Sequence, residues 1–150
     1  MLGTTHGRLA DRESVTRLIR LGAEGVLDRS FGKDGTATIR LSGRFNKLNT
    51  LAIGPEGGVL LAGTRVRRVH GSGRGRRWLV VARLRPSGVL DRGFGHRGLA
   101  ITRFGAHSDV VAREALIDAA GRLVVAGGAM APGLQPTGGF ALARYMLTRR

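Results

Sequence analysis

Hydrophobic residues along this chain come in short runs, and most of the runs end at turns that contain glycine. Runs rich in Val, Leu, Ile and Ala between Gly, Pro and Ser are typical of β-strands joined by tight turns. No stretch has the apolar spacing of a long helix, although 108–117 would also suit one or two helical turns. The pattern predicts nine strands, at 15–21, 35–41, 48–54, 58–66, 78–85, 98–104, 110–118, 122–129 and 140–146.

The order of these runs is repeated along the chain. Residues 25–35 recur as 88–98, 63 residues later, with most positions identical. Residues 51–63 match 115–127 at an offset of 64, and 15–21 matches the segment around 79–84 less closely. Chance does not easily place several matched blocks in one order at nearly one offset. The chain therefore holds two complete repeats, and residues 140–145 open a third.

Four short strands in each tandem repeat are typical of a β-propeller blade. We therefore expect an all-β, β-propeller-like fold of two four-stranded antiparallel blades plus one extra strand. The expected divisions are a flexible N-terminal arm over 1–14, a first repeat over 15–77, a second over 78–139, and the start of a third with a basic tail over 140–150.

The repeat resembles the delta-60 repeat, a β-propeller-type repeat found mostly in bacterial proteins. Its pattern is similar to an opening Phe-x-x-x-Arg-Tyr strand, a Gly-x-Leu-Asp-x-x-Phe-Gly-x-x-Gly element, a Pro-x-Gly turn and a strand ending in Ala-Gly. The matching segments are 140–145, 25–35, 88–98, 55–57, 62–63 and 126–127. Asp118-Ala119-Ala120-Gly121 departs from the Pro-x-Gly turn, and Met146-Leu147 departs from the expected continuation. The resemblance implies a propeller fold in a family whose members often carry more repeats and are often exported.

A closed propeller needs about four to eight blades, so two blades leave sheet faces and edges uncovered. Three outcomes are open: self-association of copies into a ring, a fragment of a longer repeat protein, or partial closure by the strand at 140–146. We favour a fragment slightly over an oligomer.

The residues that recur in both repeats invite a catalytic or metal role, but their recurrence favours a structural one. An Asp three residues before Phe-Gly typically holds a turn by accepting backbone N–H bonds, and the Phe would fill the space between blades. A calcium role would use Asp34, whose counterpart in the second repeat is Arg97, which weakens that hypothesis. The structural motif comprises Asp28, Phe31, Gly32, Asp91, Phe94 and Gly95.

The net charge is +15, and 23 of the 25 basic residues are arginine. Six of these lie in residues 65–77, which we expect to form a flexible basic loop between the blades. Arginines on such a loop, next to an aromatic, would bind DNA or RNA backbone without sequence preference. The alternatives are a solvated loop, which the uncharged equivalent segment 129–139 favours, and an arginine bias of the source genome. The candidate polyanion-binding residues are Arg65, Arg67, Arg68, Arg74, Arg76, Arg77 and Trp78.

Other chemistry finds little support in the sequence. The absence of cysteine excludes disulfides, thiolate metal sites and a Cys nucleophile, and the four histidines have no metal-ligand spacing. The glycine-rich residues 71–75 lack the Lys-Ser/Thr of a phosphate-binding loop, and no acid–base pair stands out. We therefore expect no enzyme activity, cofactor or metal. The function we expect is that of a non-catalytic repeat module for scaffolding or for ligand or protein binding, and the alternative is a polyanion binder.

Two further expectations concern location. No apolar run is long enough to span a membrane, and the first residues lack the apolar region of a signal peptide. By default this places the chain in the cytoplasm, although the resembled family is often exported.

Overall fold

The computed structural model describes residues 2–9, 13–42, 46–68, 75–105, 109–130 and 139–147. Within these residues all the regular elements are strands, which confirms the all-β prediction. No helix in this part of the chain is long and apolar enough to cross a membrane. The strands are β1 Leu2–Leu9, β2 Glu13–Arg20, β3 Thr36–Ser42, β4 Lys47–Ile53, β5 Val59–Arg68, β6 Gly75–Leu84, β7 Leu99–Thr102, β8 Asp109–Ile117, β9 Leu123–Met130 and β10 Gly139–Tyr145.

Strands β2 to β10 match the nine predicted strands to within a few residues at each end. Strand β1 is an addition, because the N-terminal segment was expected to be a polar arm. It pairs with β2 antiparallel along its whole length, from Leu2 opposite Arg20 to Leu9 opposite Glu13. Its residues show little alternation of apolar and polar positions, so its place in the sheet rests on main-chain pairing that composition does not reveal.

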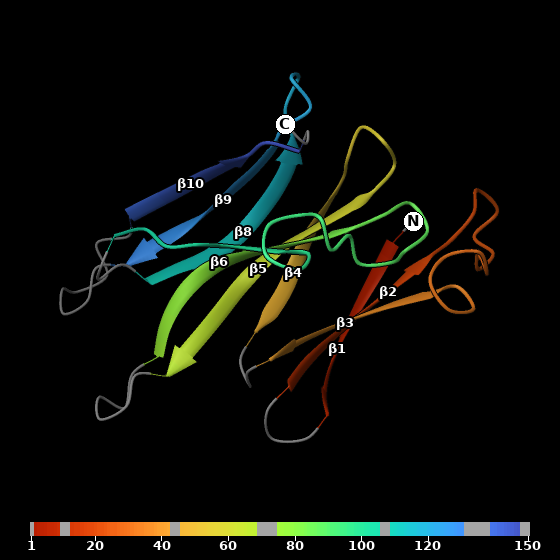
Figure 1. The fold of residues 1–150 in the computed structure, drawn as a ribbon, viewed down its shortest axis with the longest axis horizontal. Coiled ribbons are helices and arrows are strands. Elements are labelled where there is room, and N and C mark those ends of the chain that lie inside the picture. The colour runs from red at the N-terminus through yellow and green to blue at the C-terminus, as the bar shows by residue number, and fades with distance from the viewer. Residues whose placement is uncertain are drawn as a thin grey trace.

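The strands form three antiparallel sheets that lie side by side without closing into a ring (Figure 1). We call them the first sheet (β1-β2-β3), the central sheet (β4-β5-β6-β7) and the third sheet (β8-β9-β10). The prediction of two four-stranded blades plus one strand was therefore wrong in its grouping. The central sheet combines the last two strands of the first repeat with the first two of the second.

The grouping follows from which neighbours pair. Strands β5 and β6 form a long hairpin, with Val59 opposite Leu84 at one end and Arg68 opposite Gly75 at the other. By contrast, the connections from β3 to β4 and from β7 to β8 pass from one sheet to the next. Sequence identity between repeats fixes their period but not the point at which a sheet begins.

The central sheet is buried on both faces, which explains the uninterrupted apolar run of β6. One core lies between the first and central sheets and contains Leu18, Phe31, Ala37, Ile39, Leu41, Leu48, Val59, Leu61, Val80, Ala82 and Leu84. The other lies between the central and third sheets and contains Ala52, Leu60, Ala62, Leu79, Val81, Phe94, Val110, Ala112, Leu123, Val125 and Ala141.

A β-bulge recurs at the same place in both repeats and accounts for the Ala-Gly pair that closes each of them. Strand β4 shifts register between Leu48 and Thr50, opposite Gly63, and β8 shifts register opposite Gly127. A Cβ atom at Gly63 would lie 1.7 Å from the Lys47 carbonyl oxygen, and one at Gly127 would lie 2.1 Å from a carbonyl oxygen of β8. Only glycine fits where the bulged backbone approaches this closely.

Candidate functional site

The recurring aspartate of the first repeat is bound by an arginine at the end of β2. Arg20 donates from Nε to the Asp28 carboxylate at 2.8 Å and from an Nη atom to the Ser30 hydroxyl at 3.1 Å. The Arg20 guanidinium also lies over the Phe31 ring, 4.8 Å from its centroid. The Asp28 carboxylate accepts further hydrogen bonds from the backbone N–H and the hydroxyl of Ser30, at 2.9 and 2.6 Å. We call this arrangement the first Arg–Asp clamp.

The second repeat builds the same clamp from equivalent residues. Arg83 donates from Nε to the Asp91 carboxylate at 2.7 Å and forms an ion pair with the same oxygen through an Nη atom. Its guanidinium carbon is 5.2 Å from the centroid of the Phe94 ring. Asp91 also accepts the backbone N–H of Gly93 at 3.1 Å. Both recurring carboxylates are therefore engaged with an arginine and with the turn that follows them.

The two clamps differ in their exposure to solvent. The side chains of Arg20 and Asp28 are 32% and 33% exposed, whereas those of Arg83 and Asp91 are 17% and 7% exposed. The hydroxyl and backbone N–H of Ser30, together with Arg20, hold the pKa of Asp28 below its usual value. The second clamp is thus the more deeply buried of the two.

Each clamp also joins its own sheet to the next one. Arg20 donates to the Pro86 carbonyl oxygen at 2.7 Å, and Arg83 donates to the Leu147 carbonyl oxygen at 2.7 Å. These two carbonyls occupy the same place, just after the strands β6 and β10 that begin successive repeats. The recurring arginine is therefore a link from one sheet to the turn of the following sheet.

The glycine after each Phe supports the same junction. Gly32 has a φ of +65°, and a Cβ atom there would lie 2.2 Å from the Thr36 carbonyl oxygen. Its N–H donates to the Ser87 carbonyl oxygen at 2.7 Å, in the turn after β6. Gly95 occupies the equivalent position with a φ of +54°. The motif glycines thus let the chain turn tightly at the edge of a sheet.

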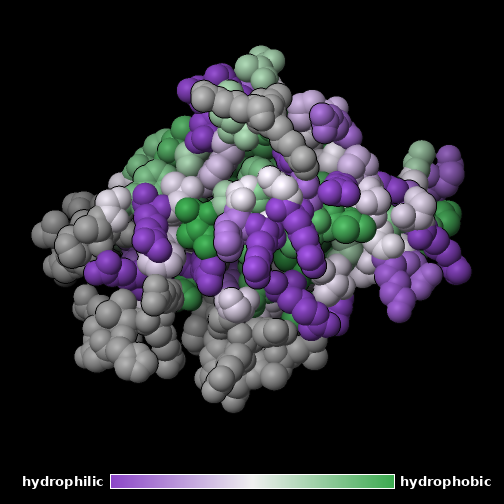
Figure 2. Space-filling view, viewed as in Figure 1, coloured by the Kyte–Doolittle hydropathy of each residue, from purple (hydrophilic) through white to green (hydrophobic). Residues whose placement is uncertain are grey.

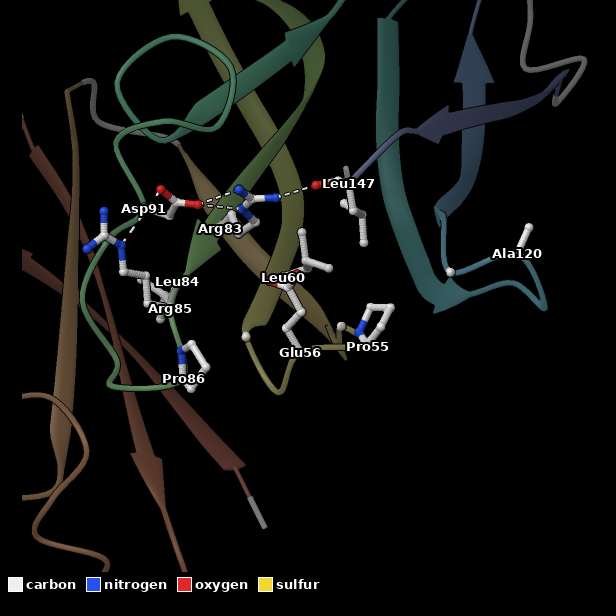
Figure 3. A pocket seen from close by; sticks show the side chains of 13 residues that line it. Pro55, Glu56, Leu60, Arg83, Leu84, Arg85, Pro86, Asp91, Ala120 and Leu147 are labelled. Carbon is white, nitrogen blue, oxygen red and sulfur yellow. Dashed lines mark hydrogen bonds and ion pairs between the residues drawn. The ribbon is translucent and has the colours of Figure 1, made fainter. Parts of the chain in front are cut away.

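A pocket of about 200 Å³ lies beside the second clamp, between turns of the central and third sheets (Figure 3). The β4–β5 turn contributes Pro55 and Glu56, and the β8–β9 turn contributes Ala120. Arg83 and Asp91 line it while they remain bonded to each other, as the dashed lines in Figure 3 show. Its volume is below the roughly 300–1,000 Å³ of typical small-molecule sites.

The arginine-rich stretch 65–77 was predicted as a loop between blades, and that prediction was wrong for 65–68 and 75–77, which are strand residues, while 69–74 lie outside the described residues. Arg65, Arg67 and Arg68 lie on β5, and Arg76 and Arg77 lie on β6. Arg67 is opposite Arg76 in the register of the hairpin. Arg74 lies outside the described residues. A hairpin that extends beyond its sheet therefore holds most of these arginines.

Trp78 lies at the base of this basic hairpin, whose described residues are 65–68 and 75–78, at the end that joins the rest of the central sheet. It is opposite Arg65 in the β5–β6 register, and the Arg103 guanidinium lies over its ring, 4.4 Å from the centroid. Arg77 donates its backbone N–H to Asp109 at 2.8 Å and forms an ion pair with that side chain at 3.8 Å. Hydrophilic residues also cover much of the face seen in Figure 2.

The turn that departs from the Pro-x-Gly pattern is held by its own carboxylate. Asp118 accepts the backbone N–H groups of Ala120 and Arg122, at 3.0 and 2.9 Å, and the Arg122 Nε at 2.8 Å. These hydrogen bonds lower the pKa of Asp118 below its usual value. A carboxylate here performs the turn-closing role that proline performs in the β4–β5 turn.

The described residues offer little to a metal ion. No group of three His, Asp or Glu side chains among them is placed to hold one. His6 lies on β1, His96 is in an exposed turn, and His70 and His107 lie outside the described residues. Asp34 and Arg97 occupy the same position in the two repeats, with φ values of 50° and 53°. This position is therefore a tight turn in both repeats, and the turn forms with either side chain.

Sequence reasoning missed the clamp arginines, although a signal was present. Arg20 and Arg83 precede the recurring aspartates by eight residues in both repeats. Arg144 holds the equivalent place in the third copy. A search for pairs of opposite charge at a repeated spacing would have identified them.

No protein-family model matches the chain, and no curated protein matches its sequence.

Proposed function

We propose that the chain is a non-catalytic repeat module of the β-propeller type, whose role is scaffolding or binding. The observation that carries this proposal is the use of the recurring residues. Asp28, Phe31, Asp91 and Phe94 are engaged in clamps and cores that join successive sheets. The resemblance of the repeat to delta-60 repeats supports the same assignment, although a fold does not by itself define a function.

The structural role of the recurring aspartates has a direct test in thermal melting. The melting temperature is expected to be the same in calcium, in magnesium and in a chelator, because the carboxylates are bonded to arginine and backbone N–H groups. A calcium-induced rise that is lost in Asp34→Asn would show instead that the motif binds a metal ion. Glu56→Gln is the matched control, because it removes one surface carboxylate from the β4–β5 turn, outside the motif.

A second candidate function is non-specific binding of nucleic acid or another polyanion by the basic hairpin. It is favoured by the three neighbouring side chains of Arg65, Trp78 and Arg103. An aromatic ring beside guanidinium groups suits a backbone phosphate with a stacked base. Against it, Arg103 already occupies one face of the Trp78 ring, and Asp109 pairs with Arg77.

The test is the anisotropy of a labelled single-stranded DNA titrated with the protein at two salt concentrations. Several phosphate contacts would make the affinity fall steeply between about 50 and about 200 mM salt. The variant Arg65→Ala/Arg76→Ala should weaken binding about tenfold or more. The control Arg29→Ala/Arg92→Ala removes the same charge from exposed turns elsewhere. Equal losses in both variants would mean that net charge alone attracts the DNA, and the hairpin would then have no specific role.

A further inference from the structure

The side of the third sheet that faces away from the central sheet is apolar and exposed. Phe140 and Leu142 of β10 are 74% and 51% exposed, and Leu116 of β8 is 54% exposed. Strand β9 lies between these two strands, with Val124 in register with Leu116 and Ala126 in register with Leu142. We call this surface the outer face. A hydrophobic patch lies over β9 and β10 at the upper left of Figure 2. Contiguous apolar surface of this kind marks an interaction site.

The repeat itself shows what these positions do when a sheet covers them. With Arg144 aligned on Arg83, Phe140 and Leu142 correspond to Leu79 and Val81 of β6. Leu79 and Val81 are fully buried in the core between the central and third sheets. The outer face therefore has the pattern of a face on which another sheet packs.

The opposite end of the row of sheets is more polar. On the outward side of β2 and β3, the exposed Arg17, Thr38 and Arg40 interrupt the apolar Val15 and Ile19. Arg17 stands where the central sheet has the fully buried Val80. A second copy that docked there with its outer face would bury an arginine against apolar side chains, which is costly. Head-to-tail stacking is thus disfavoured, as in repeat proteins that end in a polar capping face.

The outer face is complementary to itself in charge. Glu114 is in register with Ala126 and Leu142, and Arg144 is in register with Val124 and Leu116. The two charges thus flank the apolar strip at opposite edges, one pleat apart, which is about 7 Å along the strands. A twofold axis along β9 places β8 of one copy over β10 of the other, so that each Glu114 lies within one pleat of an Arg144 of the other copy.

We propose that two copies of this chain associate through the outer faces of their third sheets, about a twofold axis along β9. The contact buries Phe140, Leu142 and Leu116 of both copies and pairs Glu114 with Arg144 across it. This inference deepens the proposed function by naming a partner. A folded chain that stays monomeric would overturn it and leave the structural role of the clamps untouched.

The experiment is light scattering of the purified 150-residue chain over a range of concentrations, beside circular dichroism. The expected mass is twice the 15.9 kDa of one chain. Leu142→Asp should raise the dissociation constant about 100-fold or more, because a twofold contact loses the side chain from both copies. Val89→Asp is the matched control, since Val89 is 55% exposed on a turn away from this face. Strand-rich dichroism in both variants shows that the fold is intact.

A charge-reversal series tests the orientation. Glu114→Arg alone and Arg144→Glu alone should each weaken the dimer, and the double variant should restore it. A monomer at about 100 µM, well above the dissociation constant of a stable dimer, would overturn the proposal. So would a Leu142→Asp variant that still dimerises, or a mass that grows without limit, because open-ended growth requires a second face. A double variant weaker than both single variants would refute the proposed axis.

Discussion

The two clamps share one sequence motif but differ in burial, so the same substitution should have unequal effects in them. In Asp91→Ala the Arg83 guanidinium, which is 17% exposed, loses both of its contacts to the carboxylate. It keeps the hydrogen bond to the Leu147 carbonyl oxygen and its position over the Phe94 ring. In Asp28→Ala the remaining Arg20 is about one-third exposed and water replaces the lost partner.

The magnitude follows from the difference between buried and exposed ion pairs. Removing one partner of a buried pair typically costs about 3–5 kcal/mol, because the other charge is left without compensation. Because Arg83 is partly exposed and keeps its carbonyl partner, we expect Asp91→Ala to lie at the lower end of this range, with a loss of about 3 kcal/mol in the free energy of unfolding. That loss corresponds to a fall of roughly 6–12 °C in melting temperature for a domain of this size. Asp28→Ala should show only a small fraction of the effect, because solvent screens the exposed pair.

Urea denaturation followed by circular dichroism measures both variants on the same scale. The double variant Arg83→Leu/Asp91→Ala is the control for the mechanism. If the loss arises from an unpaired guanidinium, the double variant should be more stable than Asp91→Ala, because no buried charge remains. The slope of the denaturation curve should stay the same in all variants, which shows that the transition itself is unchanged.

Equal losses in Asp28→Ala and Asp91→Ala would refute this reasoning, because they would mean that burial of the clamp does not matter. A double variant less stable than Asp91→Ala would refute it in another way. The Arg83 side chain would then act through its packing on Phe94 rather than through its charge.

Three further predictions concern the bulge, acid stability and the single tyrosine. Gly127→Ala should unfold the chain or strongly lower its melting temperature, whereas Gly128→Ala, whose added Cβ meets nothing within 4 Å, should melt like the parent. The pKa values of Asp28 and Asp118 are lowered in the folded chain, so the stability they contribute is present above the unfolded pKa of about 3.9 and is lost as the pH falls. The melting temperature should therefore drop from about pH 5 towards pH 2, and a flat profile would contradict this. Burial raises the pKa of Tyr145, so an ultraviolet titration should show ionisation above the usual value near 10.0, and ionisation at or below it would contradict the burial of the ring.

The strands could be predicted from the sequence because each repeat places Val, Leu and Ala between turn residues. The run of β6, from Leu79 to Ala82, indicates a strand buried on both faces as soon as it is recognised as one. The grouping of strands into sheets could not be predicted, because repeat identity is the same wherever the repeat is taken to begin. It is decided by the ten residue pairs of the β5–β6 hairpin, whose arginine-rich residues 65–77 have the composition of a loop.

The clamps could be predicted only in part. The hydrogen bonds of Asp28 and Asp91 to the following backbone N–H groups suit the turn-holding role inferred from their position before Phe-Gly. Their arginine partners are eight residues away across a turn, and the third contact of each arginine lies in the next sheet. Contacts of the last kind depend on how sheets stack, and no local pattern encodes them.

The clamp contacts run in one direction along the row of three sheets. Arg20 in the first sheet reaches the turn after β6, and Arg83 in the central sheet reaches the segment after β10, so each arginine points to the sheet that follows its own. Arg144 is the third arginine of this series, and among the described residues it has no carboxylate partner. It lies beside the apolar outer face, in line with Leu142 and Phe140 on alternate positions of β10. In the two clamps the aspartate comes from the turn eight residues after the arginine, and the following sheet offers a carbonyl oxygen, whereas a second copy offers Glu114. The charge-reversal series separates the two, because only a pairing with Glu114 is restored when both charges are exchanged.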